Sequence, residues 1–244
     1  MGLQERVRRD VGLASGMLRS ALGFSEPWES SIRRFETQDR AAPPSRDGIV
    51  FVGSSSFTLW SSLAHDLAPF PVINRGFGGA LIDDVVRYVD RIVIPYAPSA
   101  VVLFAGTNDI AGPYPASPEH VAQRFDAFVS RVGASLPEAL VFYVAITPSR
   151  ARWRLWPVAQ RANRLVETRV ASTPSTLRFI DLGDRLLGPD GLPDRRLYKL
   201  DGLHPNERGY AIWTEGIRSA LEREPILVDA AGRKVGDCAL QASV

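Results

Sequence analysis

The feature that most constrains the fold is a series of short apolar runs separated by longer amphipathic segments. The runs are rich in Val, Ile and Phe, and their apolar residues are consecutive rather than alternating with polar ones. They are IVFVG (49–53), PVINRG (71–76), AVVLFAG (100–106), LVFYVAI (140–146) and LRFIDL (177–182). Continuous runs of this length are typical of parallel strands that are buried on both faces. We therefore expect a five-stranded parallel sheet.

Two of the intervening segments show helical periodicity. The apolar stripe of 118–135 contains Val121, Phe125, Val129 and Val132, and that of 207–222 contains Tyr210, Trp213, Ile217 and Leu221. Strands that alternate with helices predict a doubly wound α/β fold with right-handed crossovers. Because such sheets bind ligands beyond the carboxyl ends of their strands, the residues that follow each strand are the candidates for a site.

The sequence divides into three parts. We expect an N-terminal helical arm over residues 1–45, one α/β domain over 46–224 and a C-terminal tail over 225–244. The arm ends in AAPPSRDG, which is rich in helix breakers. The tail follows the last amphipathic segment.

Charge and hydropathy narrow the classes of partner. The 29 basic and 27 acidic residues leave a net charge of +2, so the overall charge does not indicate a nucleic-acid-binding protein. A membrane span is not expected, because no run of about 18 apolar residues occurs. The first 24 residues begin with basic side chains, but Arg19 interrupts their apolar part. We therefore expect an arm rather than a signal peptide, and a cytoplasmic protein. The sequence leaves the oligomeric state open.

The turn after the first apolar run contains three consecutive serines, Ser54, Ser55 and Ser56. A serine at a strand-to-helix turn is well placed as a nucleophile, because its hydroxyl lies at the sheet edge beside the free N–H groups of a helix start. Serine is also a favoured N-cap, so this stretch alone fits a plain turn as well. From these residues alone, any of the three serines is a candidate.

Two further turns offer hydrogen-bond donors. In NRGFGGA (74–80), the N–H of Gly79 is a candidate donor to an oxyanion, and in GTND the side-chain amide of Asn108 is another. A dinucleotide-binding fingerprint is excluded in the first of these turns, because Leu81 stands where a third small residue is required. Taken singly, the two turns also fit a glycine turn and an Asx cap.

The segment DGLHP places Asp201 three residues before His204. In a turn, this spacing brings a carboxylate to the imidazole Nδ1–H and leaves Nε2 free as a base. The alternative is that both residues only cap the following helix. His204 is the preferred base. His120 is expected in the solvated first turn of a helix and His65 as a surface or structural residue, and neither has a carboxylate at comparable spacing in so suitable a context.

Taken together, these blocks resemble the SGNH hydrolases, also called the GDSL lipase and esterase family, over roughly residues 48–222. The resemblance implies Ser55 as nucleophile with Asp201 and His204 as its acid and base. It also implies an oxyanion hole of the Ser55 N–H, the Gly79 N–H and the Asn108 side chain. The sequence departs from the family at Ser54, where the family has Asp. The implied fold is a flavodoxin-like three-layer α/β/α sandwich with five parallel strands.

The resemblance implies a serine esterase or acylhydrolase that forms an acyl-enzyme, without cofactor or metal, on a small-molecule ester, in particular a short-chain or acetyl ester. The alternatives are a lysophospholipase, a thioesterase or an acyltransferase with the same residues, or a binding module without turnover. Trp153 and Trp156 lie in a segment with six arginines between 150 and 169 and one acid, Glu167. They are candidates for substrate binding, or for packing inward beneath a solvated arginine face.

Overall fold

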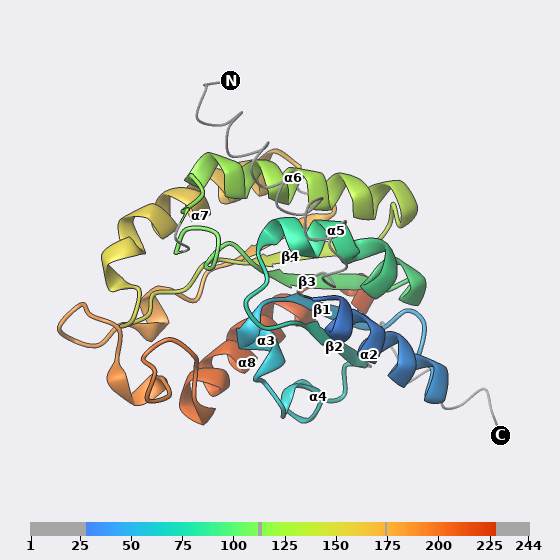
Figure 1. Cartoon of the computed structure of the whole chain (residues 1–244), viewed down its shortest axis with the longest axis horizontal. Helices are drawn as coiled ribbons and strands as arrows, with labels where there is room; N and C mark the ends of the chain where they lie inside the picture. The colour runs from blue at the N-terminus through green and yellow to red at the C-terminus, as the bar shows by residue number, and fades with distance from the viewer. Residues whose placement is uncertain (1–27, 112–113, 174, 228–244) are drawn as a thin grey trace, which may run out of the picture. The chain divides into compact units, whose positions relative to one another are not determined.

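The computed structural model describes residues 28–111, 114–173 and 175–227 (Figure 1). Most of the predicted arm and residues 228–244 of the predicted tail lie outside the described residues. The chain separates into two compact units, Met1–Pro43 and Pro44–Val244. In the first, helix α2 spans Glu29–Ala41, and Arg33 pairs with Glu29 one turn earlier at 2.9 Å. The division into arm, domain and tail stays a prediction.

The second unit is built on a five-stranded parallel sheet with the strand order β2-β1-β3-β4-β5. Its strands are β1 (Ile49–Gly53), β2 (Val72–Gly76), β3 (Ala100–Phe104), β4 (Leu140–Val144) and β5 (Leu177–Ile180). This sheet confirms the predicted fold class. The apolar runs extend beyond β3 and β4, because Ala105, Ala145 and Ile146 are buried although they lie in the loops that follow these strands.

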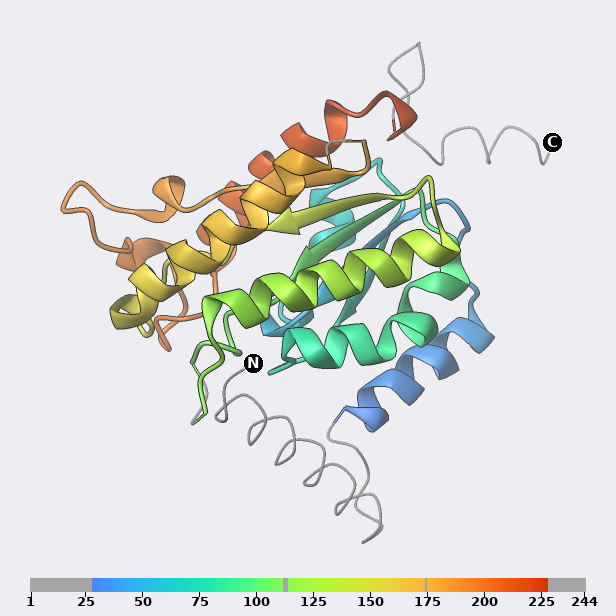
Figure 2. The ribbon, with the colours of Figure 1, turned by 90° about the horizontal axis from the view of Figure 1, so that it is seen from above.

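Helices cover both faces of the sheet, so the second unit has three layers (Figure 1, Figure 2). One face carries α3 (Ser55–Thr58), α4 (Leu63–Asp66) and α8 (Glu207–Glu222). The other face carries α5 (Ile82–Ile92), α6 (Pro118–Ser135) and α7 (Trp156–Ser172). Short 3₁₀ turns lie at Ile94–Tyr96, Trp153–Leu155, Asp184–Leu186, Arg195–Leu197 and Pro225–Leu227.

Aromatic side chains fill the layer between the sheet and α8. Trp60 stacks on Tyr210 with 4.9 Å between ring centroids, and Trp213 meets Phe104 edge-on at 4.8 Å. Leu227 is buried in the same core, so the packed domain extends at least to residue 227.

Both predicted helical stripes face the core. All four residues of the α8 stripe, Tyr210, Trp213, Ile217 and Leu221, are buried. In α6, Val121, Phe125 and Val132 are buried as expected, whereas Phe128 is buried in place of the half-buried Val129. These buried stripes pack α6 and α8 against opposite faces of the sheet. The loops at the carboxyl ends of the strands are therefore left to form the site.

Candidate active site

Of the three serines in the strand-to-helix turn after β1, only one has a solvent-accessible side chain. Gly53 has φ +150°, and a Cβ on it would lie 2.0 Å from the Phe104 carbonyl oxygen, so only glycine fits at the end of β1. Ser54 is 0% exposed and Ser56 is 7% exposed, whereas Ser55 is half-buried. The Ser54 hydroxyl has no hydrogen-bond partner among the described residues. Ser55 is therefore the serine of this turn with an accessible side chain.

The three predicted residues Ser55, His204 and Asp201 lie together. His204 Nδ1 is 2.6 Å from Asp201 Oδ2, and His204 Nε2 is 2.8 Å from Ser55 Oγ. The second Asp201 oxygen accepts hydrogen bonds from the N–H groups of Leu203, at 2.8 Å, and His204, at 3.0 Å. Asn206 then caps α8 by accepting from two N–H groups of its first turn. The carboxylate thus fixes both the turn and the imidazole ring.

The charge of Asp201 is stabilised by this turn. Partial desolvation alone would raise the pKa of Asp201, but the hydrogen bonds from the His204 ring and from the His204 and Leu203 N–H groups outweigh it and lower the pKa to about 2. The Asp201 side chain is 46% exposed and that of His204 is 17% exposed. At neutral pH the imidazole is therefore held by an ionised carboxylate.

The glycine loop after β2 lies beside Ser55. A Cβ on Gly78 would lie 4.0 Å from the Ser55 Cβ, and a Cβ on Gly76 would lie 2.6 Å from the Thr58 nitrogen. Gly79 has φ +79°, a conformation that favours glycine. The glycines thus allow the backbone of this loop to approach the first turn of α3, with Gly79 exposed.

The Asn108 side chain is held between two partners. Its Nδ2 donates to the Ala80 carbonyl at 3.0 Å, and its Oδ1 accepts from Arg152 Nη2 at 3.0 Å. Because an amide nitrogen carries two hydrogens, Nδ2 keeps one for another acceptor. Sequence reasoning did not single out Arg152, which was one of six arginines in its segment.

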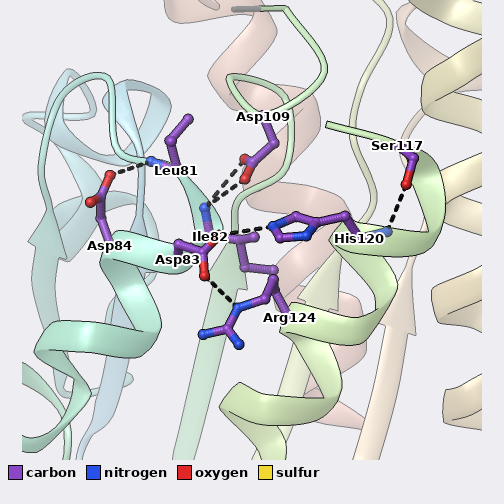
Figure 3. Close-up of polar contacts among 8 residues, drawn as sticks. All are labelled: Leu81, Ile82, Asp83, Asp84, Asp109, Ser117, His120 and Arg124. Atoms are coloured by element: carbon purple, nitrogen blue, oxygen red, sulfur yellow. Dashed lines mark hydrogen bonds and ion pairs between the residues drawn. The ribbon is translucent and has the colours of Figure 1, made fainter. Parts of the chain in front are cut away.

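Charged residues join the start of α5 to Asp109, in the turn after β3, and to α6 (Figure 3). Asp109 accepts from the Ile82 N–H with both oxygens, at 3.1 and 3.2 Å. Asp83, at the start of α5, pairs with Arg124 and lies 2.8 Å from His120 Nε2. His120 stands in the first turn of α6, as the sequence predicts, and it too has a carboxylate partner. Its partner comes from α5, 37 residues away, where sequence spacing gives no signal.

The two predicted substrate-binding tryptophans stack on each other, with ring centroids 6.3 Å apart and planes 17° apart. Trp156 also packs against a small core cluster that includes Ile146 and Ala159. A void of about 10 Å³ lies beside Trp156 and Arg152, which is room for about one water. Trp156 therefore has a packing role, and a role of either tryptophan in substrate binding stays a prediction.

Within the described ranges, no three His, Cys, Asp or Glu side chains gather as a metal site. The same residues include no helix long and apolar enough to cross a membrane.

Comparisons with known proteins agree with this architecture. Residues 47–212 match the model of the GDSL-like Lipase/Acylhydrolase family. No curated protein matches the chain. Among solved structures, a Bacteroides fragilis protein assigned as an acylhydrolase is 21% identical with a TM-score of 0.69, over 80% of this chain and 97% of that one.

Two further structures share the fold. A GDSL-like lipase from Bacteroides thetaiotaomicron is 21% identical with a TM-score of 0.64, over 78% of this chain and 96% of that one. A variant of an acetyl-xylooligosaccharide esterase from Geobacillus stearothermophilus is 16% identical with a TM-score of 0.59, over 74% and 96%. These likenesses show the fold, and the family model covers most of the second unit. The chain therefore belongs to the GDSL-like lipase/acylhydrolase family and is a carboxylic ester hydrolase.

Proposed function

We propose that the protein cleaves short-chain carboxylic esters, acetyl esters among them, through an acyl-enzyme on Ser55. The observation that carries the proposal is the continuous contact from Asp201 through His204 to Ser55, at 2.6 and 2.8 Å. A carboxylate on one ring nitrogen and a hydroxyl on the other is the arrangement that activates a serine. Ser54 and Ser56 are both buried, and no histidine of the described residues bonds to either side chain.

In the first half of the reaction, His204 Nε2 takes the proton from Ser55 as Oγ attacks the acyl carbonyl. Asp201 accepts the Nδ1–H bond and stabilises the imidazolium that forms. The negative carbonyl oxygen is then stabilised by the N–H groups of Ser55 and Gly79 and by the remaining Nδ2 hydrogen of Asn108. His204 returns its proton to the alcohol oxygen as the ester C–O bond breaks.

In the second half, water replaces the alcohol. His204 removes one proton from the water as its oxygen attacks the acyl-enzyme carbonyl, and it then protonates Ser55 Oγ as the free acid leaves. Each half of the reaction uses the same oxyanion donors, so the loss of one donor should slow both.

The test is hydrolysis of 4-nitrophenyl acetate by the purified protein and three variants. We expect Ser55→Ala to lower kcat by at least about 10³-fold, because the nucleophile is lost. Ser54→Ala and Ser56→Ala are matched controls from the same turn, and both should keep kcat within a few-fold. Full activity in Ser55→Ala would overturn the proposed nucleophile.

A comparison of substrates tests the short acyl group. Rates on acetylated xylo-oligosaccharide, 4-nitrophenyl octanoate and lysophospholipid would rank the substrate classes. A lysophospholipid rate above the rates on acetylated xylo-oligosaccharide and on 4-nitrophenyl acetate would contradict the short-chain assignment. Acylated alcohol as the main product would indicate acyl transfer.

A further inference from the structure

Arg152 holds the residue that we propose as the side-chain oxyanion donor. It lies after β4, immediately before the 3₁₀ turn Trp153–Leu155. Its Nη1 donates to the carbonyl and to the hydroxyl of Thr107, both at 2.9 Å. Its Nη2 donates to Asn108 Oδ1 at 3.0 Å. One guanidinium group thus holds two consecutive residues of the turn that follows β3.

These contacts leave the Asn108 amide only one orientation. An amide is nearly symmetric in shape, so rotation by half a turn would exchange its donor and acceptor atoms. Arg152 can only donate, and the Ala80 carbonyl on the other side can only accept. Both contacts are satisfied only when Oδ1 faces Arg152 and Nδ2 faces the glycine loop. The same orientation directs Nδ2 toward the loop that lies beside Ser55, as the proposed mechanism requires.

The positive charge of Arg152 also favours hydrogen-bond donation by the Asn108 Nδ2. The guanidinium is half-buried, and desolvation lowers the pKa of Arg152 below its ordinary value. No carboxylate forms an ion pair with Arg152 among residues 28–111, 114–173 and 175–227. A protonated guanidinium on Oδ1 polarises the amide and strengthens donation from Nδ2 to a developing negative charge.

The segment that carries Arg152 also contacts the turn that carries the base. The Ala151 N–H donates to the Gly202 carbonyl at 3.0 Å, between Asp201 and His204. The Tyr198 hydroxyl donates to the Pro148 carbonyl at 2.6 Å. Residues 148–152 therefore touch both the acid–base turn and the Asn108 turn, which gives Arg152 a fixed position relative to each.

We propose that Arg152 is a positioning residue for ester hydrolysis, which orients and polarises the Asn108 amide so that Nδ2 stabilises the oxyanion. The proposal rests on the function proposed above. It predicts that Arg152 acts on the rate only through Asn108, and that it leaves ground-state binding of a neutral ester unchanged.

The test is a double-mutant cycle with 4-nitrophenyl acetate, a substrate without charge on its acyl group. Arg152→Met keeps most of the side-chain stem and removes the donors. We expect it to lower kcat by about 10- to 100-fold with KM within about twofold, because an oriented donor is worth about 10²- to 10³-fold. In the Asn108→Ala background the same change should alter kcat by less than about twofold.

Two further variants complete the design. Arg154→Met removes an exposed arginine two residues away and should leave kcat and KM unchanged. Arg152→Lys keeps the positive charge but loses the two-pronged guanidinium that contacts Thr107 and Asn108 together. If the circular dichroism spectrum shows that Arg152→Met does not fold, the same cycle with Arg152→Lys tests the inference. We expect Arg152→Lys to have a kcat between those of wild type and Arg152→Met. In the Asn108→Ala background, Arg152→Lys should again leave kcat nearly unchanged.

The outcomes separate this inference from the proposed function. If hydrolysis depends on Ser55 but the Arg152 effect persists in full without Asn108, or appears as a raised KM with unchanged kcat, the inference is wrong and the function stands. If hydrolysis does not depend on Ser55, the proposed function fails and the inference falls with it.

Discussion

At the scale of single residues, Asp109 is a buried carboxyl group in the turn that carries Asn108. It is 4% exposed, and desolvation raises its pKa to about 6 although the Ile82 N–H bonds oppose the shift. Between about pH 4 and pH 6 the native protein therefore keeps a proton that the unfolded chain has lost. Stability from this group falls as pH rises through that window and is constant above it.

Asp109→Asn should remove this dependence, because the Asn side-chain oxygen still accepts from Ile82 but does not titrate. The free energy of unfolding of wild type relative to the variant should fall by about 2 to 3 kcal/mol between pH 4 and pH 7. Urea unfolding of both proteins at four pH values in this range measures the difference. A constant difference across the range would show that folding does not raise the pKa of Asp109.

Residues with a local signal could be predicted from the sequence. Asp201 and His204 are three positions apart, and Ser55, Gly79 and Asn108 follow successive strands, so the fold class alone predicts that they meet at one sheet edge. Arg152 lies 44 positions from Asn108 and has no characteristic spacing to it. Such a contact depends on how the loops after β3 and β4 pack, which periodicity does not encode.

At the scale of elements, the starts of all five strands could be predicted to within one residue, whereas the runs overshoot the ends of β3, β4 and β5. An apolar run in the sequence indicates burial rather than strand structure. The loop residues Ala145 and Ile146 are apolar and buried, so the sequence predicts that β4 continues through them. The end of β4 is marked instead by Asn163 of α7. Its Oδ1 accepts from the Ile146 N–H and its Nδ2 donates to the Ile146 carbonyl, both at 2.9 Å.

Asn163→Ala should therefore loosen the attachment of α7 to the end of β4. The change leaves a buried N–H and a buried carbonyl without partners, which should lower the free energy of unfolding by about 2 to 4 kcal/mol. Arg164→Ala, an exposed neighbour on the same helix, should change it by less than about 0.5 kcal/mol. Equal stability of the two variants in urea unfolding would contradict the role of Asn163.

At the scale of the whole molecule, the sheet order brings the carboxyl ends of β1, β2 and β3 side by side, with β1 in the centre. Ser55 follows the central strand β1. Gly79, with its backbone N–H, follows β2 on one side, and Asn108, with its side-chain amide, follows β3 on the other. The acid–base turn then comes from a distant part of the chain, 149 positions after Ser55. Formation of the site therefore requires the complete three-layer domain.

The most direct test of Ser55 as the nucleophile is covalent labelling of the folded protein with a fluorophosphonate, followed by tandem mass spectrometry of the peptide that contains residues 54–56. We predict one adduct per chain, on Ser55, which disappears in Ser55→Ala and persists in Ser54→Ala and Ser56→Ala. His204→Ala should label far more slowly, because the serine loses its base. An adduct on Ser54 or Ser56, or no adduct on protein that hydrolyses esters, would contradict the assignment.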